Sequence, residues 1–280
     1  MAAAAAAAGV AWVTWGDPSS VSAIEPSHVA GAHTGKVYLV GAGPGAADLL
    51  TLRAARLLAT ADVVVSDALI GPEILAGVRE DCLVITMGKR GGDARATKQT
   101  DINTALVEQA QQGRTVVRLK GGDPLLFGRV AEEMRALDAA GVAYEIVPGI
   151  TSPFAAAAEV GIPLTHKTLS TTLVLTTGHD PSLLDFTALA RMDTVAIVMA
   201  TRTLEAIVDG LVEGGKAPST PVCIVRNTTL PNGAIYTGTL DRVVADTERL
   251  KLSPAVLIVG EVAALAQGGG CTPDRLSAEL

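Results

Sequence analysis

Asp67 and the pair Lys89-Arg90 are the side chains of this sequence best suited to acid–base and ionic chemistry. Asp67 comes directly after a predicted strand at 62–66, and Lys89-Arg90 follows the next predicted strand at 82–86. Ligands of α/β proteins gather at the carboxyl ends of the strands, where a carboxylate can accept a proton and a cation can hold an anionic group. The alternatives are a turn or helix cap for Asp67 and ordinary surface charge for the basic pair.

Two glycine-rich segments also follow predicted strands: Gly41-Ala-Gly-Pro-Gly45 and Lys120-Gly-Gly-Asp-Pro124. The first matches the opening of a dinucleotide-binding fingerprint. Pro44, however, has no N–H to donate to a phosphate, so the loop is better suited to an uncharged or cationic ligand. In the second segment the glycines allow a ligand to approach the backbone, and Asp123 can accept hydrogen bonds from it. Each segment alone is also compatible with a tight turn that binds nothing.

The elements that must position these residues alternate along the chain. Apolar runs predict strands at 37–41, 62–66, 82–86, 115–119 and 143–147, then at 172–177, 194–199, 221–226, near 235 and at 255–259. Helical patterns lie at 50–58, 101–112, 130–140, 204–213 and 241–250. Alternation of this kind favours parallel βαβ units, so the predicted fold class is α/β with two α/β domains.

The predicted domain organisation has five parts. We expect a disordered tail (1–35), an N-terminal α/β domain (36–150), a connector (151–170), a C-terminal α/β domain (171–265) and a loose tail (266–280).

Composition limits the class of protein. Hydrophobic residues make up 49% of the 280 residues and aromatic residues only 3%, which suits sheets covered by helices. The mean hydropathy is +0.38, but no uncharged apolar run reaches the roughly 20 residues that span a membrane. The three cysteines are far apart and form no CxxC pair, so neither a disulfide framework nor a metal site is predicted. These features favour a cytoplasmic protein.

The charge distribution suggests the kind of ligand. The net charge of −7 disfavours nucleic acid as a partner. Residues 88–129 nevertheless carry eight basic and four acidic side chains. A basic region on an acidic chain is typical of a protein that binds a small polyanion, and the alternative is a solvated surface with ordinary ion pairs.

The string Arg118-Leu-Lys-Gly-Gly-Asp-Pro-Leu-Leu-Phe-Gly-Arg129, together with Val40-Gly-Ala-Gly-Pro-Gly45, resembles the tetrapyrrole methylase family. The longer string is similar to the signature of the branch that methylates uroporphyrinogen III, and the resemblance extends over about 36–262. It implies ligand sites at the sheet edges and in the cleft between the two domains. It also implies a homodimer that uses S-adenosyl-L-methionine, releases S-adenosyl-L-homocysteine and methylates uroporphyrinogen III at C2 and C7 to give precorrin-2. Such a product feeds sirohaem or cobalamin biosynthesis.

The resemblance also implies roles for individual residues. Asp67 corresponds to a proton acceptor and Lys89 to a proton donor; the family usually has His where this chain has Ser66. Arg90, Arg129 and Lys167 are the predicted substrate-binding residues. Lys167 replaces the usual Arg and lacks its bidentate fork. The predicted cofactor-binding residues are Pro44, Gly121, Gly122, Asp123, Leu126, Thr151, Ser152, Met199 and Thr228.

Three alternatives stay open at this point. One is a methyltransferase that acts on a later precorrin, which would share fold and cofactor. Another is a nicotinamide-dependent oxidoreductase, which Pro44 disfavours. The third is a ligand-binding module without turnover.

Overall fold

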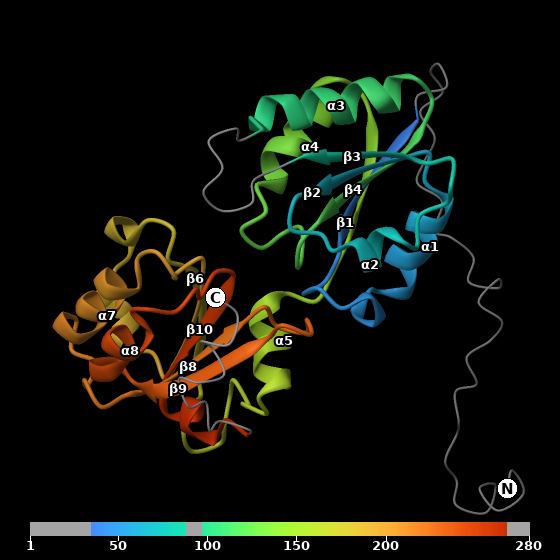
Figure 1. Cartoon of the computed structure of the whole chain (residues 1–280). Helices are drawn as coiled ribbons and strands as arrows, with labels where there is room; N and C mark the ends of the chain where they lie inside the picture. Colours follow the sequence, from blue (N-terminus) through green and yellow to red (C-terminus); the bar gives the residue numbers. More distant parts are fainter. Residues whose placement is uncertain (1–34, 88–96, 268–280) are drawn as a thin grey trace, which may run out of the picture. The chain divides into compact units, whose positions relative to one another are not determined.

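The computed structural model describes residues 35–87 and 97–267. Its first sheet has five parallel strands in the order β3-β2-β4-β1-β5 (Figure 1). The strands are β1 (Lys36–Gly41), β2 (Val63–Asp67), β3 (Leu83–Met87), β4 (Thr115–Lys120) and β5 (Ala143–Val147). β1 and β4 lie side by side at the centre of this sheet. The carboxyl ends of all five strands therefore meet at one edge.

Helices cover both faces of the first sheet. They are α1 (Leu52–Thr60), α2 (Pro72–Leu75), α3 (Gln99–Gln111) and α4 (Val130–Ala139). Val116 packs with residues of α3 and α4, whereas its neighbour Val117 packs with residues of α1 and α2. Figure 1 shows the two helix pairs on opposite faces of the sheet. Since side chains alternate along a strand, Arg118 and Lys120 share the face of Val116 and lie beneath α4.

The second sheet is mixed and has the order β6-β7-β10-β8-β9. Its strands are β6 (Leu173–Thr177), β7 (Thr194–Val198), β8 (Pro221–Arg226), β9 (Ala234–Thr239) and β10 (Ala255–Val259). Only β6 and β7 pair in parallel, and the other three pairs are antiparallel. The short connection 227–233 explains the β8–β9 hairpin, because a parallel pairing requires a much longer crossover.

Helices also pack on both faces of this second sheet. They are α5 (Ser152–Glu159), α6 (Phe186–Ala190), α7 (Leu204–Glu213) and α8 (Leu240–Thr247). α6, α7 and α8 pack against one face, where Ile197 and Leu257 are fully or almost fully buried. α5 packs with Cys223 and Ile258 on the other face. Short 3-10 helices at 47–49, 181–183 and 261–265 complete the described residues.

The predicted α/β class is confirmed, and most strand boundaries differ from the predicted ones by no more than one or two residues. One shift concerns the site: Asp67 and Lys120 are the last residues of β2 and β4, not the first residues after them. The predicted domain boundaries stay a prediction, and the two predicted tails lie almost wholly outside the described residues. No helix in the described part of the chain is both long and apolar enough to cross a bilayer.

Candidate active site

Three glycine-containing loops meet backbone to backbone at the carboxyl edge of the first sheet. Gly43 and Gly122 exchange two hydrogen bonds of 3.2 and 2.8 Å across an isolated β-bridge. Gly149 lies against both neighbours: a β-carbon added to it would stand 2.3 Å from the Gly122 oxygen and 2.8 Å from the Gly41 Cα. No side chain fits between these loops. The loops after β1, β4 and β5 therefore form one continuous surface.

Asp123 links two of these loops through its carboxylate. One oxygen accepts the N–H of Leu125 at 2.8 Å, within its own loop, and the other accepts the N–H of Gly149 at 3.0 Å. A carboxylate has about four acceptor positions, so Asp123 can still accept a hydrogen bond from a ligand. The residue therefore both shapes the site and offers it a charged acceptor.

A pocket of about 540 Å³ adjoins these loops. Three of the predicted cofactor residues line it: Asp123, Leu126 and Thr151. The other lining residues, which the sequence analysis did not single out, are Leu125, Gly149, Ile150, Phe154 and Leu175. The pocket is thus largely apolar with one carboxylate at its wall, and its volume is typical of small-molecule sites.

The predicted cofactor residues of the loops after β1, β4 and β5 that do not line the pocket are Gly121, Gly122, Ser152 and Pro44. Gly121 and Gly122 belong to the β4 loop, and a β-carbon on Gly122 would lie 3.7 Å from the Thr151 Cα. Ser152 begins α5. Pro44 lies between Gly43 and Gly45, which both have positive φ. Their contact with a cofactor stays a prediction.

Met199 and Thr228 occupy loops after β7 and β8. Met199 has a φ of +55° and is 48% exposed. Thr228 is buried, and its hydroxyl donates a 2.6 Å hydrogen bond to Glu159 Oε2. The Thr228 side chain is thus held by a hydrogen bond within the protein, and the expected ligand contact through its backbone stays a prediction.

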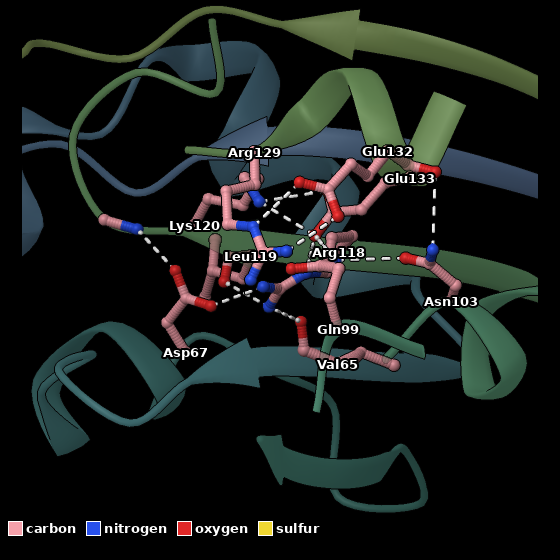
Figure 2. Close-up of polar contacts among 11 residues, drawn as sticks. Val65, Asp67, Gln99, Asn103, Arg118, Leu119, Lys120, Arg129, Glu132 and Glu133 are labelled. Atoms are coloured by element: carbon pink, nitrogen blue, oxygen red, sulfur yellow. Dashed lines mark hydrogen bonds and ion pairs between the residues drawn. The ribbon is translucent and has the colours of Figure 1, made fainter. Parts of the chain in front are cut away.

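Asp67 ends β2 beside a buried group of charges (Figure 2). Its Oδ1 accepts a 2.5 Å bond from Arg118 Nη2, and its Oδ2 accepts the Gly121 N–H at 3.3 Å. Arg118 Nε donates to Glu133 Oε1 at 3.0 Å, and Lys120 Nζ donates to both Glu133 oxygens at 2.8 and 3.0 Å. Glu133 is completely buried, whereas the Asp67 side chain is 31% exposed. Asp67 is therefore the exposed end of this charged group.

This arrangement corrects the expectation that all the basic side chains of 88–129 are available to bind a polyanion. Arg118 and Lys120 point into the protein and are neutralised by Glu133 and Asp67, so they do not present charge to a polyanion. Glu133 was not among the residues predicted from the sequence. A signal existed, because a strand that is otherwise apolar and carries buried cations requires a buried anion nearby.

Burial and the charge of Arg118 lower the pKa of Lys120, while Glu133 opposes that shift. Glu133 thus helps Lys120 to stay charged in the interior.

Of the residues predicted to donate a proton or bind substrate, the structure describes Arg129 and Lys167. Lys89, the predicted proton donor, and Arg90 lie outside the described residues. Arg129 has a φ of +54° and forms a bidentate pair with Glu132, at 2.8 and 2.7 Å. Lys167 is exposed. Among residues 35–87 and 97–267, no three His, Cys, Asp or Glu side chains gather as a metal-binding group.

Comparison with known proteins identifies the family. A family model described as tetrapyrrole (corrin/porphyrin) methylases matches residues 36–244. The chain belongs to this family. It is 43% identical over 232 residues to the uroporphyrinogen-III C-methyltransferase of Synechococcus elongatus, across 83% of this chain and 95% of that relative. It is 44% identical over 235 residues to the siroheme synthase of Zymomonas mobilis, and there it spans about half (50%) of the relative's length.

Solved structures of the family have the same fold. Uroporphyrin-III C-methyltransferase from Thermus thermophilus, complexed with S-adenosylhomocysteine, superposes with a TM-score of 0.73 and is 36% identical in sequence. The match covers 82% of this chain and 100% of that structure. A cobalt precorrin-4 methyltransferase, 28% identical, superposes with a TM-score of 0.74. The fold is thus common to family members that carry different substrate names.

Proposed function

We propose that the protein is a methyltransferase that uses S-adenosyl-L-methionine to methylate uroporphyrinogen III at C2 and C7, giving precorrin-2 by way of precorrin-1. The observation that carries the proposal is the 43% identity that extends over 95% of a uroporphyrinogen-III C-methyltransferase. The pocket beside the glycine loops supports it. Precorrin-2 from this reaction would feed sirohaem or cobalamin biosynthesis, and the protein would act as a cytoplasmic homodimer.

The pocket fits the cofactor chemically. S-Adenosyl-L-methionine is a sulfonium without phosphate, so it requires no cradle of N–H groups, and Pro44 is compatible with it. Leu125, Ile150 and Phe154 line the pocket and are large and exposed, so a bound adenosine or thioether group would cover apolar surface. Asp123 would accept hydrogen bonds from a hydroxyl or the amine. When bound, the cofactor supplies an already activated methyl group.

We expect Asp123→Ala to weaken S-adenosyl-L-methionine binding by about 10-fold or more, since it removes a charged acceptor and leaves the Leu125 and Gly149 N–H groups without their partner. Titration calorimetry measures this effect. Asp138→Ala, which removes a carboxylate from α4, is the control. Unchanged affinity in Asp123→Ala would exclude Asp123 from the cofactor site.

We propose Asp67 as the proton acceptor. Methylation of an electron-rich pyrrole carbon would form a C–C bond while the methyl–sulfur bond breaks and S-adenosyl-L-homocysteine leaves. The ring would then be cationic and would return to neutrality by losing a proton. A carboxylate oxygen can take that proton, and the Asp67 carboxylate is held at the sheet edge by its pair with Arg118. The 31% exposure of Asp67 leaves it accessible from the edge of the sheet. The rest of the catalysis is alignment of the reacting carbon with the methyl group, which the loops supply by positioning.

We propose that Arg129 binds one of the substrate carboxylates in place of Glu132. Exposed ion pairs are weak, so a polyanionic substrate can displace Glu132. Glu132→Gln is therefore expected to lower KM for uroporphyrinogen III about two- to threefold at low salt, with a smaller effect at high salt. Steady-state kinetics at two ionic strengths test this, with Glu108→Gln on α3 as a control for net charge. A KM that rises in Glu132→Gln would contradict it.

Incubation of the protein with S-adenosyl-L-methionine and anaerobically prepared uroporphyrinogen III, followed by mass spectrometry, tests the function. We expect a gain of two methyl groups, with positions assigned by NMR. No gain despite cofactor binding would move the substrate to a later precorrin. Size-exclusion chromatography with light scattering tests the proposed homodimer.

A further inference from the structure

Glu133, Arg118 and Lys120 form a buried ionic cluster behind Asp67 (Figure 2). The Arg118 and Lys120 side chains are each 3% exposed, and that of Glu133 is 0% exposed. Burying ions is unfavourable, and well-packed apolar residues of similar volume often stabilise an interior as well or better. Stability alone therefore gives no reason for three buried ions at this place.

The Arg118 guanidinium is held from several directions. Its Nε donates to Glu133, and its Nη1 donates to the carbonyl oxygens of Val65 at 3.3 Å and Leu119 at 3.4 Å. Nη2 points to Asp67. A guanidinium is planar, so anchors on Nε and Nη1 fix the direction of Nη2 as well. The position of Glu133 on α4 is thereby transmitted to the carboxylate at the end of β2.

Lys120 balances the remaining charge. Its Nζ contacts both Glu133 oxygens, so two cations face two carboxylates in the group of four. Gln99 Nε2, at 3.4 Å, is a further donor to Glu133 Oε1. Glu133 is thus held by groups from α3 and β4 and presents a fixed acceptor to Arg118.

We propose that Glu133 is a positioning residue for methyl transfer: it fixes the Arg118 guanidinium, which in turn holds the Asp67 carboxylate at the sheet edge. This inference rests on the proposed function and on Asp67 as its proton acceptor. Glu133 itself lies in the interior and acts only through Arg118. Its loss affects turnover more than cofactor binding.

Two double variants of the full chain separate positioning from packing. Both variants remove the buried Glu–Lys pair and place side chains of similar size at position 133. They are Glu133→Gln/Lys120→Met and Glu133→Leu/Lys120→Met. They differ in that only glutamine offers an oxygen to Arg118 Nε. Thermal unfolding establishes that each variant is folded, calorimetry gives the S-adenosyl-L-methionine Kd, and steady-state assays give kcat and KM.

We expect kcat of the leucine-containing variant to be about 10- to 100-fold below that of the glutamine-containing one, because a displaced base loses its alignment. Their cofactor Kd values should agree within about twofold. Equal kcat values in two folded variants would overturn the proposal and leave Glu133 a packing residue.

If either double variant fails to fold, Arg118→Lys decides the question. Lysine keeps the charge, but its single nitrogen cannot bridge Glu133 and Asp67 as a planar fork does. A kcat reduced about 10-fold or more with cofactor affinity retained supports the proposal, and full kcat overturns it. The unmutated chain is the reference throughout: if it does not methylate uroporphyrinogen III, the proposed function itself fails.

Discussion

Asp67→Asn is expected to lower kcat for methylation of uroporphyrinogen III by about 100-fold or more, because an amide cannot accept the proton that the methylated ring must lose. The S-adenosyl-L-methionine Kd should change less, by about threefold at most, since Asp67 bonds to the proposed cofactor loop through the Gly121 N–H at 3.3 Å. Both neighbours of the carboxylate are donors, Arg118 and Gly121, so asparagine can satisfy only one of them with its oxygen. Stopped-time assays with mass spectrometry measure kcat, and calorimetry measures Kd.

Asp62→Asn is the matched control. Asp62 precedes the same strand at its amino end and also pairs with an arginine and a backbone N–H, those of Arg79 and Thr115. Asp62→Asn therefore removes the same charge and similar hydrogen bonds as Asp67→Asn, but at the opposite end of the strand from the carboxyl edge. We expect its kcat to match that of the unmutated protein. If Asp67→Asn abolished cofactor binding, or if both variants lost kcat equally, Asp67 would not be the base.

The fold was predictable from sequence where local pattern decides it. Buried apolar runs such as 255–259, which Gly260 follows, predict strands, and parallel pairing of the first sheet follows from its intervening helices. The mixed pairing of the second sheet was not predicted. It depends on the position of β10, which lies between β7 and β8. Packing between segments that are distant in sequence determines this position, so local sequence patterns do not predict it.

The candidate site was predictable in part for the same reason. The glycine loops and Asp67 stand out because each follows a predicted strand, and the family resemblance implied their roles. What sequence could not show is that Gly41, Gly122 and Gly149 touch, since they are separated by dozens of residues along the chain. Glu133 was missed because a single Glu on an amphipathic helix is typical of a solvated face. Only its register against Arg118 places it in the interior.

Gly149→Ala is expected to weaken S-adenosyl-L-methionine binding by about 10-fold or more and to lower thermal stability. The added β-carbon would stand 2.3 Å from the Gly122 carbonyl oxygen and 2.8 Å from the Gly41 Cα. These nearest atoms are all backbone, so no side chain can rotate away to make room. The β4 and β5 loops must therefore separate, which breaks the Asp123–Gly149 hydrogen bond at the wall of the pocket. Overpacking of this kind costs about 1–3 kcal/mol or more.

Gly71→Ala provides the comparison for Gly149→Ala. Gly71 has a φ of −72° and no atom within 4 Å of an added β-carbon, so alanine fits there without strain. Its cofactor Kd and melting temperature should stay close to those of the unmutated protein. Calorimetry and thermal unfolding of both variants, measured side by side, test whether the contact of the glycine loops builds the cofactor site. A Gly149→Ala variant that binds S-adenosyl-L-methionine as tightly as Gly71→Ala would mean that the cofactor does not depend on this contact, and the pocket beside Asp123 would lose its main structural support as the cofactor site.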